Sequence, residues 1–238
     1  MIDVDVRHLG KLDLDEYLDK DTIAALLGAY PDFSSSQSGC HKWLTESLPK
    51  RMVYSYLYGD ILTGLPSAVS VVDVGGGGVT ALTRILARNS RYTLIDLLAH
   101  DDKQAAEKLL IECGARLNQE DWYESNPDVP IDILIANDLF PNVDQRLGIF
   151  LDKYTPIARE SRILLTYYSN ERFYKVKRTD ADELMFLRAW TGHDVANELG
   201  RRFPSIPLSH LNAFICPEDS LYANGRNISI LTLRRTEE

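Results

Sequence analysis

The chain has 238 residues and a formal net charge of −9 at pH 7, and 45% of its residues are hydrophobic. This length suits one domain with a sizeable core and room for a small cap. Because an acidic surface repels phosphate backbones, the charge argues against nucleic acid as a partner or substrate.

The cysteine content and the N-terminus indicate the compartment. Cys40, Cys113 and Cys216 lie far apart in the sequence and form neither a disulfide framework nor a CxxC metal pair. The first residues lack the basic and apolar regions of a secretory signal, and no apolar run reaches the roughly 18 residues that span a bilayer. We therefore expect a cytoplasmic protein with no membrane contact. A homodimer stays open, because nothing in the sequence decides the oligomeric state.

The first quarter of the chain predicts helices. Apolar residues at helical spacing indicate one helical stretch over about 12–30 and a second over about 41–63. Pro49 inside the second stretch implies a kink or two shorter helices, and Gly64 marks its end.

From Ala68 onward, short apolar runs alternate with amphipathic stretches. This alternation predicts an α/β fold with a mostly parallel sheet that is covered on both faces. The last two strands have no helix between them, so we expect an antiparallel pair. The expected strands cover 69–74, 92–98, 115–118, 131–137, 162–168, 211–216 and 227–234. The expected helices cover 79–86, 101–113 and 143–154, with one or two more between about 180 and 203.

Four consecutive glycines, 75–78, separate a buried valine-rich strand from the helix that follows. Such a loop lets a ligand approach the backbone and the helix N-terminus at the carboxyl edge of the sheet. Gly76, Gly78 and Ala81 formally match the dinucleotide pattern G-x-G-x-x-A, which leaves an NAD(P)-dependent oxidoreductase open. However, Asp73 would place a negative charge near a pyrophosphate, whereas the same charge favours a sulfonium or an ammonium group.

The segment VVDVGGGGVTAL resembles the first motif of the class I S-adenosylmethionine-dependent methyltransferases, which is an acid followed by a glycine loop. The resemblance extends in element order over residues 68–235. One departure is Val79, where the family's motif most often ends in a further glycine. The resemblance implies a Rossmann-like seven-stranded sheet with an antiparallel last pair, and S-adenosyl-L-methionine as the cofactor. It places the methionine part of the cofactor against Asp73, Gly75, Gly76 and Gly77.

Further residues fit the rest of that cofactor. Asp96 lies near the end of the second expected strand, where a carboxylate can accept both ribose hydroxyls, and Leu97 beside it is a further expected contact. Asp121 follows the third strand position, where it can accept a hydrogen bond from the adenine amino group. Trp122 offers a stacking surface for the ring.

The loop after the fourth expected strand resembles in position the family's fourth motif, which lies beside the transferable methyl group. Asn137 is expected at the cofactor there, and Phe140 either covers the acceptor or packs in the core. Asp138 is the first candidate for a general base and His41 the second. We expect no metal, because Asp138 has no second carboxylate within its loop.

Aromatic residues are candidates for the acceptor site. Tyr54 and Tyr58 belong either to the packing or to a surface that stabilises a cation. Tyr168 leaves the fifth expected strand at the site edge. The resemblance implies that residues 1–66 form a helical cap that covers the substrate, and that residues 67–238 form the cofactor-binding domain.

The sequence thus predicts an S-adenosylmethionine-dependent methyltransferase that acts on oxygen or nitrogen of a small molecule. Catalysis would depend mainly on positioning, with a carboxylate or histidine base where the acceptor needs one. Two alternatives stay open, an NAD(P)-dependent oxidoreductase and a non-catalytic protein that binds S-adenosylmethionine. The sequence does not identify the acceptor.

Overall fold

The structure is a computed structural model, and it describes residues 1–30, 39–65, 69–75, 79–98, 102–127, 130–178, 183–217 and 220–236. The strands are β1 (Ile2–Leu9), β2 (Ser70–Val74), β3 (Arg91–Ile95), β4 (Arg116–Asn118), β5 (Ile131–Phe140), β6 (Ala158–Tyr168), β7 (Phe173–Arg178), β8 (Glu183–Arg188) and β9 (Arg226–Arg235). The helices are α1 (Lys11–Leu18), α2 (Thr22–Gly28), α3 (Gly39–Glu46), α4 (Leu48–Thr63), α5 (Thr83–Asn89), α6 (Lys103–Cys113), α7 (Leu147–Tyr154), α8 (Gly192–Arg202) and α9 (Leu208–Ile215).

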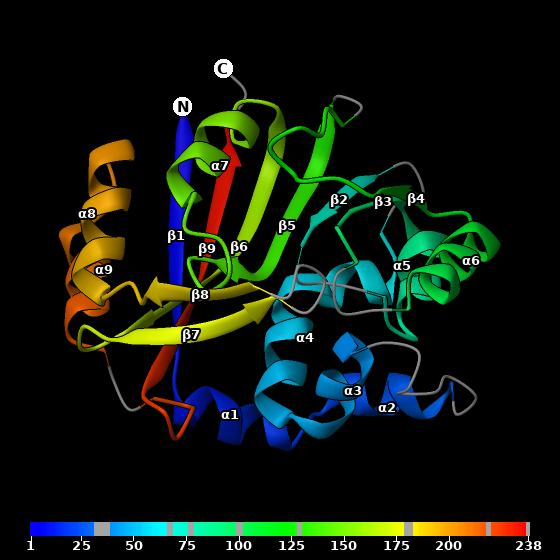
Figure 1. Ribbon diagram of the computed structural model, residues 1–238, viewed down its shortest axis with the longest axis horizontal. Helices are drawn as coiled ribbons and strands as arrows, with labels where there is room; N and C mark the ends of the chain where they lie inside the picture. The colour runs from blue at the N-terminus through cyan, green and yellow to red at the C-terminus, as the bar shows by residue number, and fades with distance from the viewer. Residues whose placement is uncertain are drawn as a thin grey trace.

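Seven strands form one sheet in the order β1-β9-β6-β5-β2-β3-β4, and helices cover both of its faces (Figure 1). Strand β9 runs antiparallel to both of its neighbours, while β6, β5, β2, β3 and β4 are parallel to one another. The expected seven-stranded, mostly parallel sheet with an antiparallel last pair is therefore confirmed. Separate apolar cores lie on the two faces, which explains why the central strands read as continuous apolar runs.

The prediction is wrong for one strand of the expected closing pair. Residues 211–216 were expected to be a strand, but most of them lie in helix α9, where Phe214 is fully buried. The place beside β9 belongs to β1, which pairs from Ile2 with Arg235 to Leu9 with Ile228. The sequence of β1 alternates apolar and polar residues, as expected for an edge strand with one buried face.

A second difference concerns the segment after β6. Residues 183–188, expected in a helix, form strand β8, which pairs with β7 as a separate two-stranded ribbon. The helix expected before residue 203 is confirmed as α8. Its start is fixed by a capping box in which Thr191 and Asp194 each bond to the other's backbone N–H.

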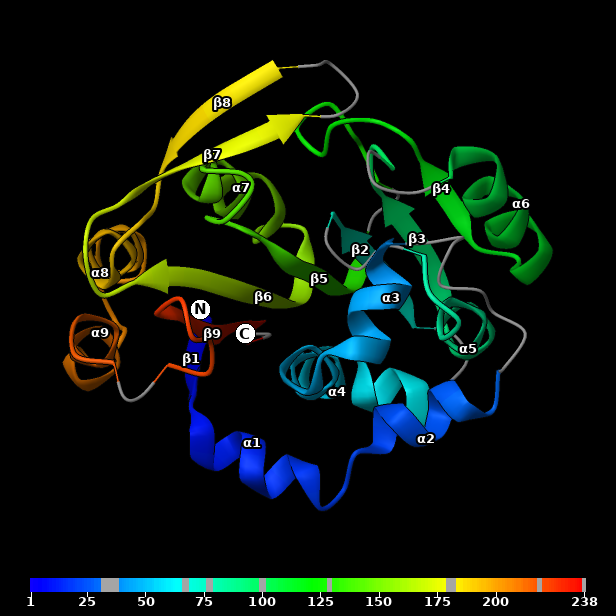
Figure 2. The ribbon, with the colours of Figure 1, turned by 60° about the horizontal axis from the view of Figure 1, so that its bottom comes forward.

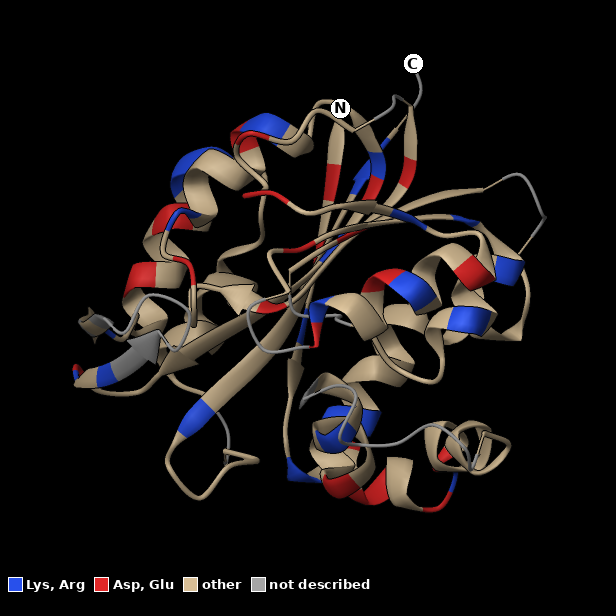
Figure 3. Ribbon diagram, turned by 45° about the vertical axis from the view of Figure 1, so that its right-hand side comes forward, with Lys and Arg blue, Asp and Glu red and all other residues tan. Residues whose placement is uncertain are grey.

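Helices α1 to α4 lie together at the end of the molecule where the parallel strands finish (Figure 2). The expected break at Pro49 is confirmed, because α3 and α4 are separate helices and Pro49 lies in the first turn of α4. The segment 1–66 also supplies β1 to the main sheet, so it is not wholly helical. Its role as a cover for substrate stays a prediction, as does the boundary at 66. Acidic and basic residues are interspersed over the helices on both sides (Figure 3).

Substitution of Phe150 tests the packing between helix α7 and the sheet. Its side chain is fully buried, with ring centroids 4.6 Å from Phe140, 4.9 Å from Tyr154 and 5.3 Å from Trp122. We expect Phe150→Ala to lower the free energy of unfolding by about 3–5 kcal/mol, measured by urea denaturation. Ile149→Ala, at a 45% exposed position of the same helix, should change it by no more than about 0.5 kcal/mol. Equal losses in the two variants would contradict this assignment of the core.

Candidate active site

The turn after β2 is built for a glycine. Gly75 has φ +69°, and its N–H donates to the carbonyl oxygen of Ile95 at 2.9 Å. A Cβ atom here would lie 2.9 Å from Cδ2 of Leu139, so a larger residue would be both strained and crowded. Gly76 and Gly77, also expected at the cofactor, lie outside the described residues. The backbone thus turns sharply at the carboxyl end of the central strand.

Asp73 lies just before this turn and is completely buried. Tyr58 and Tyr92 donate hydrogen bonds to its Oδ2 at 2.9 and 2.6 Å, whereas Oδ1 has no hydrogen-bond partner among the described residues. Burial, with a smaller effect of the Asp96 carboxylate, raises the pKa of Asp73 from 3.8 to about 7 against the opposing effect of the two tyrosine hydrogen bonds. A cation beside Oδ1 would favour the ionised form.

Asp96 and Leu97 follow β3 at the same edge of the sheet. Oδ1 of Asp96 accepts a hydrogen bond from the backbone N–H of Leu98 at 2.7 Å, and Leu98 has φ +52°. This turn leaves Leu97 with 43% of its surface exposed. The exposed leucine and the neighbouring carboxylate fit an adenosine, and their roles stay predictions.

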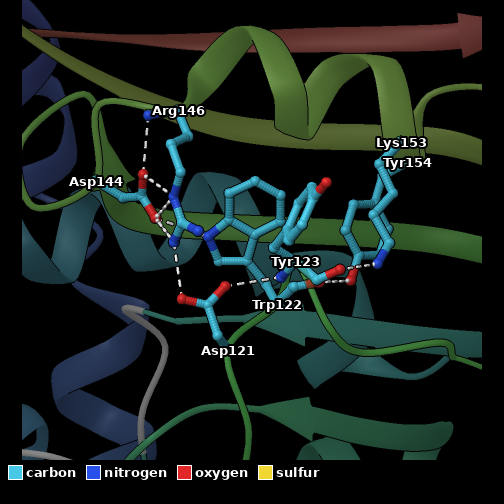
Figure 4. A network of polar contacts seen from close by, with 7 residues as sticks. All are labelled: Asp121, Trp122, Tyr123, Asp144, Arg146, Lys153 and Tyr154. Carbon is cyan, nitrogen blue, oxygen red and sulfur yellow. Dashed lines mark hydrogen bonds and ion pairs between the residues drawn. The ribbon is translucent and has the colours of Figure 1, made fainter.

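Asp121 belongs to a polar network around Arg146 (Figure 4). The Arg146 guanidinium donates to Asp121 Oδ2 at 2.8 Å and to both carboxylate oxygens of Asp144, and it lies 4.6 Å from the ring centroid of Trp122. Burial alone would raise the pKa of Asp121, but the hydrogen bond and charge of Arg146 lower it overall. Sequence analysis did not identify Arg146 or Asp144. Asp121 remains a candidate for adenine, although part of its acceptor capacity is already used.

The aromatic residues of this region belong to the core. Trp122 is 5% exposed, its Nε1 donates to Asp144 at 2.8 Å, and its ring packs edge-on against Phe140 and Phe150. Phe140 is fully buried. Both rings thus pack in the core, while the expected stacking of Trp122 on adenine and the expected contact of Phe140 with the acceptor stay predictions. An aromatic residue after a strand gives the same sequence signal whether it packs inward or contacts a ligand.

A small cavity of about 30 Å³ lies between the N-terminal helices and the carboxyl ends of β2 and β5. Oδ1 of Asn137, which contributes to its wall, is buried and has no hydrogen-bond partner in the described part of the chain. This volume holds no more than a water or two. A larger hollow of about 400 Å³ lies at the opposite edge, beside Ile2 and Pro156, and contains no expected site residue. The small cavity is lined by Cys40, Trp43, Leu44, Lys50, Tyr54, Thr80 and Asn137.

Helices α3 and α4 carry three of the expected site residues, and each has a different environment. Tyr54 lines the cavity and stacks on Tyr58, with 4.1 Å between the ring centroids. Tyr58 is fully buried and directs its hydroxyl to Asp73, as in the packing alternative, and its contact with substrate stays a prediction. Nδ1 of His41 lies 3.4 Å from the backbone N of Ala81 and accepts its hydrogen bond. Burial lowers the pKa of His41, so the ring is neutral at pH 7.

Asp138 has a left-handed backbone, with φ +58°, and its carboxylate is surrounded by donors. Lys50 bonds to Oδ2, and Oδ1 accepts from Asn142 at 3.2 Å and from Thr166 at 3.3 Å. Arg226 lies 3.7 Å from Oδ1. Burial alone would raise the pKa of Asp138, but the charges of Lys50 and Arg226 lower it overall, so the group is ionised and weakly basic. A general-base role for Asp138 stays a prediction.

Tyr168 ends β6 on the Arg226 side of this carboxylate. It is 8% exposed, and the guanidinium of Arg172 lies 4.4 Å from its ring centroid. Its contact with an acceptor stays a prediction.

Among the described residues, no group of three histidine, cysteine or acidic side chains is arranged to hold a metal ion. No helix in the described part of the chain combines the length and apolar character needed to cross a membrane.

No family model matches the chain, and no curated protein sequence matches it significantly. Among solved structures, it is similar to 1,6-didemethyltoxoflavin-N1-methyltransferase of Burkholderia thailandensis, with 20% identity, a TM-score of 0.50, and coverage of 94% of this chain and 90% of that chain. It also matches the N-methyltransferase NodS of Bradyrhizobium japonicum WM9, with 12% identity, a TM-score of 0.44, and coverage of 80% and 99%. The chain therefore has the fold of the class I S-adenosylmethionine-dependent methyltransferases, as the glycine-loop motif implied.

The raised pKa of Asp73 predicts a specific pH dependence of stability. A carboxyl group with a raised pKa stabilises the fold below pH 3.8, and this contribution is lost as the pH rises to about 7. Asp73→Asn removes the ionisation, so its advantage in unfolding free energy over the wild type should grow by about 2–3 kcal/mol between about pH 5 and about pH 8. Urea titrations of the ligand-free proteins measure this. Asp15→Asn, at an exposed position, is the control and should show no such trend. If the unfolding free energies of the wild type and Asp73→Asn changed in parallel with pH, the raised pKa of Asp73 would be contradicted.

Proposed function

We propose that this protein binds S-adenosylmethionine at the carboxyl edge of its sheet and transfers the methyl group to a small molecule. The observation that carries the proposal is Oδ1 of Asp73, a buried carboxylate oxygen beside the Gly75 turn that has no hydrogen-bond donor among the described residues. The fold supports it as well, and the Burkholderia enzyme that shares this fold was crystallised with S-adenosylhomocysteine.

The chemistry of the site fits a cationic ligand. Asp73 and Asn137 lie near the carboxyl ends of the adjacent parallel strands β2 and β5. Tyr58 connects them, because it donates to Asp73 and also interacts with the Asn137 amide. Each of the two side chains keeps one buried oxygen to which no described residue donates. An amino-acid ammonium group supplies such donors, and a sulfonium is attracted by the same charge. Among the described residues these orphaned groups are acceptors, which a pyrophosphate could not satisfy.

Bound S-adenosylmethionine supplies an electrophilic methyl group on a cationic sulfur. The protein's part is to bind and orient the reactants. We assign the ribose hydroxyls to Asp96 and the adenine face to the exposed Leu97. Lys50 and Tyr54 line the cavity on the methyl side and exclude water from it.

Positioning carries most of the catalysis in this proposal. Asp138 is ionised but already paired with Lys50, so it is a weak proton acceptor. Nδ1 of His41 accepts the Ala81 N–H, which assigns the ring proton to Nε2 and leaves no free lone pair on the ring. Alignment of donor and acceptor in a dry site can contribute roughly 7–11 kcal/mol. A nitrogen acceptor needs the least help from a base, and the Burkholderia enzyme's name describes N-methylation.

Calorimetry tests the cofactor assignment. We expect S-adenosylmethionine to bind and NADH to give no heat of binding. Asp96→Asn should weaken S-adenosylmethionine by about tenfold or more, because the carboxylate would no longer accept two ribose hydroxyls. Asp152→Asn, at the opposite edge of the sheet and 66% exposed, is the control and should bind normally. Tight NADH binding without a response to S-adenosylmethionine would overturn the proposal in favour of an oxidoreductase.

The pKa of Asp73 gives a second prediction. Since the cationic ligand needs the ionised carboxylate, the dissociation constant for S-adenosylmethionine should rise as the pH falls below about 7, approaching about tenfold per pH unit. Asp73→Asn should bind more weakly at every pH and without this slope. A wild-type affinity that is independent of pH between about 5.5 and 8 would show that Asp73 does not face the cation.

A further inference from the structure

Arg226, at the start of β9, carries hydrogen-bond donors that nothing in the described structure uses. Its side chain is 14% exposed, and both Nε and Nη2 are buried without a hydrogen-bond acceptor. The ring of Tyr222 lies against the guanidinium, 4.3 Å from it, and holds it in place. Buried donors of a charged group are rarely left unpaired, because their desolvation is costly. The arrangement therefore calls for an acceptor that the described residues do not supply.

The charges around Arg226 do not balance. Asp138 is the carboxylate that faces it, but Oδ1 of Asp138 lies 3.7 Å away, beyond hydrogen-bond distance. The same carboxylate is already bound by Lys50, Thr166 and Asn142. Asp138 pairs more closely with Lys50 than with Arg226, so the positive charge of Arg226 is only partly offset among the described residues.

This charge lies next to the expected methyl-transfer cavity. Lys50 and Asn137 line the cavity, and Asp138 directly follows Asn137 and connects Lys50 with Arg226. Tyr168 is the neighbour of Arg226 on the adjacent strand, because the two residues are paired in the register of β6 and β9. Tyr174 also interacts electrostatically with Arg226. A molecule that reached from the cavity to Arg226 would pass along this carboxylate and these rings.

We propose that Arg226 recognises a carboxylate on the methyl acceptor, so that the substrate is a small, preferably aromatic, organic acid. This inference rests on the proposed function. Nε and Nη2 lie on one edge of the planar guanidinium, and such an edge matches the two oxygens of a carboxylate in a bidentate pair. This edge of the Arg226 guanidinium and its single positive charge suit a monoanion, whereas a phosphate dianion would need further donors.

Benzoate and benzamide form a matched pair of probes, because they differ in the charge of the group that Arg226 would bind. With the protein saturated by S-adenosylhomocysteine, we expect calorimetry to show that benzoate binds at least about tenfold more tightly than benzamide. Arg226→Gln should abolish this preference, and Arg226→Lys should retain only part of it, since lysine keeps the charge but lacks the fork. Arg172→Gln, which removes the cation over Tyr168, is the control and should keep the preference.

Affinity for S-adenosylhomocysteine, measured in the same series, separates this inference from the proposed function. All four proteins should bind S-adenosylhomocysteine equally, which also shows that the variants are folded. If none binds it, the proposed function fails, whatever the result with benzoate. If S-adenosylhomocysteine binds but benzoate does not bind, binds no better than benzamide, or binds Arg226→Gln as well as the wild type, the carboxylate site is wrong and the cofactor site stands.

Discussion

The site depends on one buried carboxylate. Asp73 is withdrawn from solvent at the end of β2, and it is tolerated there because Tyr58 of α4 and Tyr92 of β3 both donate to it. These two hydrogen bonds join the N-terminal helices, the central strand and the neighbouring strand at one point. They satisfy only one oxygen, so the fold carries an electrostatic cost that a bound cation would relieve.

The parts of the fold that the sequence predicted are the local ones. The strand before the glycines and the start of the strand at Ile131 are marked by apolar runs, so their positions follow from the sequence. The end of the second strand does not, because β5 continues through a register shift to Phe140, three residues past the expected end. Strand β1 could not be placed in this way, because its partner β9 lies at the other end of the chain. Segment 208–215 is short and apolar, and its periodicity does not distinguish a strand from a helix.

The same limit applies to the site. Asp73 and Asn137 lie toward the ends of β2 and β5. Gly75 and Asp96 directly follow β2 and β3. The carboxyl edge of the sheet therefore collects all four, and their placement there could be predicted. Their hydrogen-bond partners could not. Lys50 and Arg226 meet at Asp138 from segments far apart in the sequence, and neither belongs to a motif. The burial of the aromatic residues could not be predicted either, because burial is a property of the tertiary structure.

The two halves of the site differ in their unpaired groups, which are hydrogen-bond acceptors on one side and donors on the other. On the side of β2, the described side chains present unpaired oxygens, whereas on the side of β9 they present unpaired N–H groups. The Lys50–Asp138 ion pair lies between these sides. A cationic methyl donor and an anionic acceptor would each be attracted to its own side and repelled from the other. Because transfer requires the reacting atoms in line, this separation of charge would orient both molecules before any proton moves, and it would make positioning the main catalytic contribution of this protein.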